Sequence, residues 1–205
     1  KKLQKHSQEL INADKKNEKN FISLEKKYLK VQKEMVSAMK AVHFNSTTGQ
    51  SQRDWRTNAT TPGHALQFKN TPYKGRIYVP ANHSKGDPIK GFNEYRTYGF
   101  YTDDHGKSFK VSPDLKTPSS NEAIGVELSD GRLMLNIREQ NGSTKTRLIA
   151  LSSSAGEKWD TEFFDNELIS PVCQSSVLLF EGSRDTILLY SGPNSKSKRE
   201  SMTIK

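Results

Sequence analysis

The chain has 205 residues, which is enough for one large domain or two small ones. Its formal net charge is +9, but residues 1–43 contain eleven Lys against five Asp and Glu and account for +6 of that charge. A positive charge confined to one segment indicates a solvated helix face. A nucleic-acid surface would instead cluster arginines with interleaved aromatic residues. We therefore expect no nucleic-acid partner.

Cysteine usage and apolar runs narrow the class of protein further. Cys173 is the single cysteine, which excludes an intramolecular disulfide and a cysteine-based metal cluster. The longest apolar run, Val177–Phe180, is far shorter than the roughly 20 residues that span a bilayer, so we expect no membrane span. No spacing of His, Asp and Glu side chains indicates a metal site, and we expect no cofactor.

Residues 16–43 show the period of an amphipathic α-helix, the main element of a basic helical segment that we assign to residues 1–43. Apolar residues recur at helical spacing, with Lys and Glu between them. We expect this helix to pack on its own domain. The alternative is an oligomerisation helix, for which the apolar stripe is a weak seam. The stripe consists of Phe21, Leu24, Tyr28, Val31, Met35, Ala38 and Val42.

From residue 44 onward the period changes to that of short β-strands separated by Gly, Asn and Asp turns. Such runs, with no second helical pattern, predict an all-β domain over residues 44–205, either a sandwich or a propeller. The expected strands are Arg76–Pro80, Tyr95–Thr102, Lys107–Ser112, Ala123–Leu128, Arg132–Ile137, Thr146–Ser152, Ser175–Phe180, Thr186–Ser191 and Met202–Ile204.

Two degenerate copies of the turn motif S-x-D-x-G-x-[ST]-[WF] lie at Thr102–Phe109 and Ser152–Trp159, and each connects two of these strands. In the first motif a carboxylate is placed to accept hydrogen bonds from its own turn, a glycine permits positive φ, and an aromatic side chain plugs between sheets. In the second motif a serine replaces the aspartate. We therefore assign both motifs a structural role. Two copies at a period of about 40–50 residues, the length of a propeller blade, favour a propeller over a sandwich. The residues concerned are Asp104, Gly106 and Phe109 in the first, and Gly156 and Trp159 in the second.

These motifs, with further sequence blocks in a fixed order, make residues 55–205 resemble the exo-α-sialidases (neuraminidases) of the bacterial type. That family folds as a six-bladed β-propeller with Asp-box (BNR) repeats. At roughly 40 residues a blade, the resemblance implies a partial six-bladed propeller of about three to four blades, preceded by the amphipathic helix. The blocks are Pro62–His64 with Gly75–Pro80, Asn121–Arg138, Pro171–Ser176, and Leu188–Asn194 with Arg199.

The resemblance implies a glycosidase that releases terminal α-linked sialic acid from sialylated glycans with retention of configuration. Because the substrate carboxylate would repel a carboxylate nucleophile, sialidases use a tyrosine that a glutamate activates. By resemblance, Glu122 matches that glutamate, and Arg138 and Arg199 match two of three arginines that bind the substrate carboxylate. Gln174 and His64 are further candidates for the substrate pocket.

Several of these residues also have structural interpretations. Glu127 competes with Glu122 within the same motif, although the spacing to Arg138 favours Glu122. Arg138 can instead pair on the surface with Glu139 or Asp130, a contact that contributes little stability. The other candidate arginine, Arg199, lies in a basic run typical of a loop tip.

Other parts of the sialidase site are absent from the sequence. By resemblance, the first arginine and the acid/base aspartate belong before Trp55, and the tyrosine nucleophile belongs beyond Lys205. We therefore expect flanking or partner sequence to supply the remaining blades, and the isolated chain to be inactive. The family favours a secreted or periplasmic location. The alternatives are a non-catalytic sialic-acid-binding propeller module and a scaffold assembled through the N-terminal helix.

Overall fold

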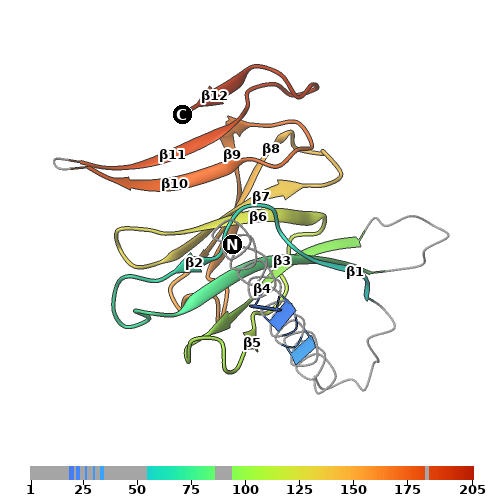
Figure 1. Cartoon of the computed structure of the whole chain (residues 1–205). Coiled ribbons are helices and arrows are strands. Elements are labelled where there is room, and N and C mark those ends of the chain that lie inside the picture. The colour runs from blue at the N-terminus through green and yellow to red at the C-terminus, as the bar shows by residue number, and fades with distance from the viewer. Residues whose placement is uncertain are drawn as a thin grey trace, which may run out of the picture.

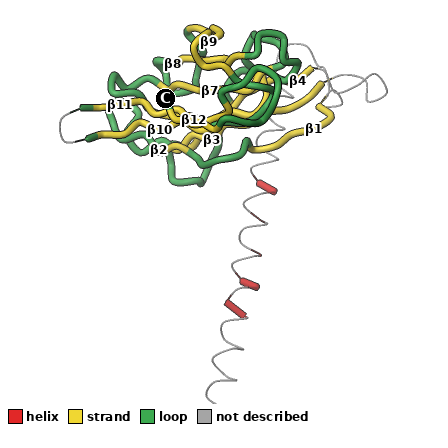
Figure 2. The backbone as a smooth tube through the Cα atoms, turned by 90° about the horizontal axis from the view of Figure 1, so that it is seen from above, coloured by secondary structure: helices red, strands yellow, loops and turns green. Residues whose placement is uncertain are grey.

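The computed structural model describes residues 55–85, 94–182 and 185–205, together with eight separate residues between 19 and 34. The three longer ranges hold twelve strands in three antiparallel sheets that follow one another along the chain (Figure 1). Figure 2 shows the same strands from above, joined by loops and turns. The all-β class predicted from the sequence is confirmed.

Each sheet is built from strands that are near neighbours in sequence, as tight turns between short strands require. The first sheet has the order β1-β3-β4-β5 with β2 also paired to β3, the second has the order β6-β7-β8-β9, and the third has the order β10-β11-β12. The strands are β1 (Trp55–Thr60), β2 (Leu66–Gln67), β3 (Ile77–Lys85), β4 (Glu94–Thr102), β5 (Lys110–Val111), β6 (Ser120–Glu127), β7 (Leu133–Glu139), β8 (Thr146–Ser152), β9 (Thr161–Ile169), β10 (Ser176–Glu181), β11 (Thr186–Pro193) and β12 (Met202–Ile204).

All nine strands expected from the sequence overlap strands of the structure. Three strands, β1, β2 and β9, were not predicted. The apolar stripe of the N-terminal helix lies outside the described residues, so its packing stays a prediction. The eight residues described in that region are helical and exposed, namely Lys19, Asn20, Ile22, Ser23, Lys26, Lys30, Lys33 and Glu34.

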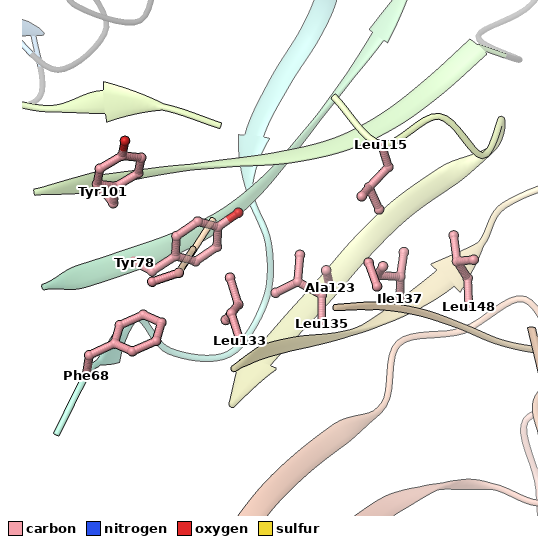
Figure 3. Close-up of a cluster of buried hydrophobic side chains, with 11 residues drawn as sticks. Phe68, Tyr78, Tyr101, Leu115, Ala123, Leu133, Leu135, Ile137 and Leu148 are labelled. Atoms are coloured by element: carbon pink, nitrogen blue, oxygen red, sulfur yellow. The ribbon is translucent and has the colours of Figure 1, made fainter. Parts of the chain in front are cut away.

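The main core lies between the first and second sheets. Aromatic side chains from the first sheet and its loops pack against small and branched aliphatic side chains of the second (Figure 3). Burial of this apolar surface is the main driving force that holds the two sheets together. Figure 3 labels Phe68, Tyr78, Tyr101, Leu115, Ala123, Leu133, Leu135, Ile137 and Leu148.

Strand β7 contributes to two cores because its side chains alternate between its faces. Leu133, Leu135 and Ile137 belong to the core against the first sheet. Met134, on the other face, belongs to a smaller cluster that includes Val177 of the third sheet. The second sheet is therefore covered on both faces, which explains why β7 is buried along nearly its whole length.

The third sheet has one covered face and one exposed apolar face. Val177 points toward the second sheet, so the alternate residues of β10 point away from it. The strand pairings place side chains of β11 and β12 on the same outward face. We call this the outer face of the third sheet. Its large exposed residues are Leu178, Phe180, Ile187, Met202 and Ile204, which are 48–72% exposed.

Candidate functional site

The β6–β7 hairpin brings Glu122 and Arg138 together. Ala123 pairs with Ile137, so the preceding residue of β6 and the following residue of β7 are neighbours across the two strands. Arg138 Nη1 donates a hydrogen bond to Glu122 Oε2 at 2.6 Å, and both side chains are partly buried. The two residues that the sequence places at the ends of this hairpin therefore form a charge-assisted hydrogen bond.

The pair lies on the face of the second sheet that packs against the third. Arg138 is four residues beyond Met134 and so shares its face. Between them lies Asn136, which is fully buried. The interface between these two sheets therefore changes from apolar, at Met134, to polar toward the end of β7 that carries Arg138.

Arg147 of β8 occupies the centre of this polar region. Its side chain is 1% exposed. Its Nε donates to Asn136 Oδ1 at 2.6 Å, and its Nη1 donates to the carbonyl oxygen of Cys173 at 2.7 Å. Burial lowers the pKa of Arg147 to about 10, so it remains a cation at neutral pH.

Several buried polar atoms in this region have no hydrogen-bond partner among the residues that the structure describes. They include Arg138 Nε, Arg147 Nη2, Asn136 Nδ2 and Tyr190 Oη. Tyr190 pairs with Val177 and therefore also faces the second sheet. Because buried polar groups are normally paired, a cluster of unpaired donors beside a carboxylate is the feature expected of a site that binds a ligand.

The loop before β10 connects this region to Arg199. The Nη2 of Arg199, whose side chain is exposed, donates to the carbonyl oxygen of Val172 at 3.1 Å. The same loop accepts the hydrogen bond from Arg147 one residue later, at Cys173. Arg199 is therefore close in space to the loop that Arg147 anchors, although it forms no ion pair with a described residue.

His64 lies two residues before β2, and Gln174 lies two residues before β10. Gln174 Nε2 donates to the carbonyl oxygen of Pro62 at 3.2 Å, which joins the segment before β10 to the segment before β2. His64 lines a groove of about 260 Å³ between β2, β6 and β10. The β6 residues that line this groove are Gly125, Val126 and Glu127, so His64 lies toward the Glu127 end of the second sheet, whereas Gln174 does not line the groove.

Three other carboxylates near the β6–β7 hairpin were alternatives to Glu122, either as the catalytic base or as the partner of Arg138. Glu127 accepts backbone N–H bonds from Lys69 and Asn70 at 2.7 and 3.1 Å, and so holds the segment after β2. Asp130 pairs with Arg132 at 2.7 Å on the surface. A third carboxylate, Glu139, accepts backbone N–H bonds of its own turn. Each of these three carboxylates has partners other than Arg138.

The first turn motif is held by Asp104. The carboxylate accepts hydrogen bonds from the backbone N–H and hydroxyl of Ser108 at 2.9 and 2.6 Å. These bonds, the hydroxyl first, hold the pKa of Asp104 below its ordinary value. Gly106 has a φ of +84°, and Phe109 contacts Phe100 edge-to-face. The turn is thus stabilised by its own side chains.

The second turn motif uses serine where the first uses aspartate. Ser154 Oγ accepts the backbone N–H of Lys158 at 3.0 Å. Gly156 has a φ of +93°, and a Cβ at this position would lie 2.2 Å from the ring of Tyr78. Trp159 Nε1 donates to the carbonyl oxygen of Pro113 at 2.8 Å. The hydroxyl of serine therefore supports the turn without a carboxylate.

Arg76 joins the two turn motifs across the first and second sheets. It donates to both carboxylate oxygens of Asp103 at 2.7 and 3.0 Å and to Glu157 at 2.8 Å. Its guanidinium also lies 4.6 Å from the ring of Tyr73 and 4.1 Å from the ring of Tyr101. Burial alone would lower the pKa of Arg76, but its two carboxylate partners raise it above the ordinary value.

The turn motifs and the Glu122–Arg138 pair lie at opposite ends of the second sheet. Glu127 pairs with Leu133, which in turn pairs with Ser152 at the start of the second motif. Glu122 is at the other end of β6. In the part of the chain that the structure describes, no three His, Cys, Asp or Glu side chains are grouped as metal ligands. The helical residues described include no stretch long and apolar enough to cross a membrane.

Comparison with known proteins agrees with this architecture. Residues 18–205 match the family model described as a BNR repeat-like domain. The chain belongs to the BNR repeat-like family. Its relatives include a sialidase of Micromonospora viridifaciens, 26% identical over 157 residues, and Sialidase-2 of Cricetulus griseus, 27% identical over 175 residues. The resemblance to sialidases is confirmed.

Solved structures show the same fold for this BNR repeat-like chain. The intramolecular trans-sialidase from Ruminococcus gnavus, in complex with oseltamivir carboxylate, superimposes with a TM-score of 0.62 at 23% identity. Trypanosoma rangeli sialidase, in complex with the inhibitor DANA, gives a TM-score of 0.57 at 19% identity. Each match covers 73% of this chain, and 30% and 24% of the other chain respectively. The three sheets therefore correspond to part of a sialidase propeller.

The chain spans only a part of the relatives it matches. The matched region is 74% of this chain but 23% of the Micromonospora viridifaciens sialidase, and 78% of this chain but 44% of Cricetulus griseus Sialidase-2. The family and the partial-propeller fold are thus established over the described strands.

Arg147, Asn136 and Arg76 were not singled out from the sequence. One signal was available for Arg147, because it is the charged residue of an otherwise apolar run, Thr146–Ser152, in a strand buried on both faces. The other two residues depend on contacts with distant segments, and the local sequence contains no comparable signal for them.

Proposed function

We propose that this chain is part of a sialidase-type glycoside hydrolase that releases terminal α-linked sialic acid from sialylated glycans. The observation that supports this most directly is the Glu122–Arg138 pair, at 2.6 Å, beside a cluster of unpaired buried donors in a BNR repeat-like fold. A carboxylate and guanidinium groups at one end of the sheets are the chemistry that an acidic sugar requires.

Arg138 and Arg199 would bind the carboxylate of the substrate. A guanidinium presents several N–H donors in a planar fork that matches a carboxylate. Only Nη1 of Arg138 is engaged by Glu122, and its Nε has no partner among the described residues. Arg199 is held at a single nitrogen by Val172. Both side chains therefore keep N–H donors for a ligand. Gln174 would be a further pocket residue, joined through Pro62 to the segment that carries His64.

Glu122 would act as the base of a retaining mechanism. A tyrosine from flanking or partner sequence would transfer its phenolic proton to Glu122 as its oxygen bonds to the anomeric carbon. The glycosidic bond breaks, and the leaving oxygen takes a proton from an acid. Water then attacks the anomeric carbon and gives a proton to the conjugate base of that acid, while the tyrosine leaves and regains its proton from Glu122.

The outer face of the third sheet supports the proposal that further blades complete the propeller. Its five large apolar side chains are 48–72% exposed, and exposed apolar patches of this kind mark interaction surfaces. A further four-stranded antiparallel sheet, supplied by flanking or partner sequence, would cover this face as the third sheet covers the second.

The test compares binding and hydrolysis in the same preparation. We expect the isolated chain to bind sialic acid, measured by calorimetry, and to release no fluorophore from a fluorogenic sialoside. Binding should weaken by at least tenfold in Arg138→Ala, since an interaction with a charged group is lost. Arg132→Ala, on the surface, is the matched control. Absence of sialic-acid binding would contradict the proposed site. Turnover by the isolated chain would contradict the expectation that flanking or partner sequence supplies the tyrosine nucleophile.

A non-catalytic sialic-acid-binding module is the second candidate. It is favoured by the engagement of Glu122 with Arg138, because that hydrogen bond occupies one of the two carboxylate oxygens that could accept the proton of a tyrosine. The two candidates differ once flanking sequence is added. A longer protein that contains the tyrosine should hydrolyse a sialoside if the chain belongs to an enzyme, and should bind without turnover if it is a binding module.

A further inference from the structure

Among the described residues, Arg147 is the largest fully buried side chain, and none of them gives it a carboxylate partner. An isolated buried cation is costly, because the interior replaces water poorly around a charge. The hydrogen bonds of Arg147 go to neutral acceptors, the side chain of Asn136 and the carbonyl of Cys173. A core that needed only packing would be more stable with an apolar residue here.

The first of these hydrogen bonds joins β8 to β7 within the second sheet, and the second joins β8 to the loop before the third sheet. Asn136 lies two residues before Arg138 in β7, and Cys173 lies in the loop that leads into β10. Asn136 Oδ1 also accepts from the hydroxyl of Ser175 at 3.1 Å. The fork of Arg147 therefore fixes the strand that carries Arg138 against the loop that Arg199 contacts.

The positive charge of Arg147 also helps to orient the side chain of Arg138. Leu148 pairs with Ile137, which makes Arg147 and Arg138 cross-strand neighbours on one face of the sheet. Like charges in this position repel each other. The carboxylate of Glu122 lies on the other side of Arg138, in β6, and attracts it. Both forces orient the Arg138 guanidinium toward Glu122 and away from β8.

We propose that Arg147 is a positioning residue, which holds Arg138 in the orientation that binds a carboxylate and links that strand to the loop before β10. The inference rests on the proposed function for the ligand of its binding test, but its structural part does not depend on that ligand. Its side chain is only 1% exposed, so Arg147 acts through Arg138 and this loop.

The binding test uses sialic acid and its methyl ester, in which one added methyl group removes the charge of the carboxylate. We expect Arg147→Met to weaken binding of the acid by about tenfold and of the ester by less than about twofold. Arg147→Lys keeps the charge and most of the stem but loses the fork, and should weaken binding of the acid by about threefold. Arg76→Met is the matched control, because it also removes a buried arginine that joins two sheets.

A positioning role of Arg147 and a general loss of stability predict different results for these variants. All variants are compared at a temperature where circular dichroism shows them folded, and Arg147→Lys serves if Arg147→Met does not fold. Equal weakening for acid and ester, or the same loss of acid binding in Arg76→Met, would overturn the inference.

A second readout needs no ligand. The Nε–H resonance of Arg138, followed by NMR, should shift and broaden in Arg147→Lys and stay in place in Arg76→Met. If the unmodified chain binds neither ligand, the proposed function fails, and this resonance alone decides the role of Arg147. An unchanged Arg138 resonance in Arg147→Lys would overturn the inference.

Discussion

The two ends of the second sheet use arginine in opposite ways. At the end with the turn motifs, Arg76 has two carboxylate partners, two backbone carbonyl partners and two aromatic rings against its guanidinium. At the other end, Arg147 is buried with neutral acceptors only, and both it and Arg138 retain N–H groups without described partners. Their pKa values follow this difference, raised for Arg76 and lowered for Arg147.

This is the difference expected between a structural arginine and arginines that serve a binding site. A fully hydrogen-bonded polar network gives rigidity and a single arrangement, whereas unpaired donors cost stability unless a ligand or another group uses them. Natural proteins leave buried polar groups without hydrogen-bond partners mainly at functional sites. We therefore propose that the turn-motif end provides stability and that the Glu122 end binds the ligand, and each proposal can be tested separately.

The largest expected effect on stability is at Arg76. Arg76→Met leaves Asp103 and Glu157 without their cation and removes the contacts with both rings. Loss of one partner of a buried pair costs about 3–5 kcal/mol, and the half-exposed carboxylates bring the expected loss to the lower end of that range. Urea denaturation measures it. A loss below about 1 kcal/mol would show that the network is not structural.

Removal of Arg138 should affect stability much less than removal of Arg76. Its pair with Glu122 is partly exposed, and the repulsion between Arg138 and Arg147 is relieved. We expect Arg138→Ala to change the free energy of unfolding by less than about 1 kcal/mol, while sialic-acid binding weakens by at least tenfold. A loss of stability as large as that in Arg76→Met would remove the distinction between the two ends.

A smaller effect, dependent on pH, is expected at Asp104. Its pKa is depressed in the folded state by hydrogen bonds from Ser108, so its contribution is present above the unfolded pKa of about 3.9. That contribution is lost as the pH falls through the lower folded pKa. We expect Asp104→Asn to lower the melting temperature at pH 7, and the gap to the unmodified protein to close toward pH 2.

The second turn motif provides the control for this pH dependence. Ser154 has the position of Asp104 but no titrating group. The gap in melting temperature between Ser154→Ala and the unmodified protein should therefore stay constant over the same pH range. A gap for Asp104→Asn that did not change with pH would indicate that its carboxylate is not stabilised by ionisation.

The smallest effect is expected at Arg132. Its ion pair with Asp130 is as short as the pairs of Arg76, at 2.7 Å, but it lies on the surface. Exposed pairs contribute little, because water solvates both charges. Arg132→Ala should leave the melting temperature and sialic-acid binding unchanged, and a measurable change in either would show that distance rather than burial sets the value of these pairs.

Periodicity and turn residues were sufficient to predict most of the sheets, because hairpins are encoded by neighbouring residues. Strand β9 was missed because its run Asp165–Glu167 is polar. An edge strand with exposed residues tolerates such a run. Strand β2 was missed because it has only two residues and depends on its pairing with β3.

For the candidate site, the local part was predictable and the part between sheets was not. The contact of Glu122 with Arg138 follows from a hairpin that the sequence marks with its Ser-Asp-Gly turn. The role of Arg147 depends on Cys173, which lies 26 residues away in the loop of another sheet. Contacts of that kind are fixed by the packing of sheets, and spacing within one strand does not encode them.

A crystal structure of the chain with bound sialic acid tests the central claim most directly. The account predicts that the sugar carboxylate lies within hydrogen-bond distance of Arg138, at the Glu122 end of the second sheet, with Arg76 and its partners unchanged. Sialic acid bound at the turn-motif end, or bound without a contact to Arg138, would contradict it.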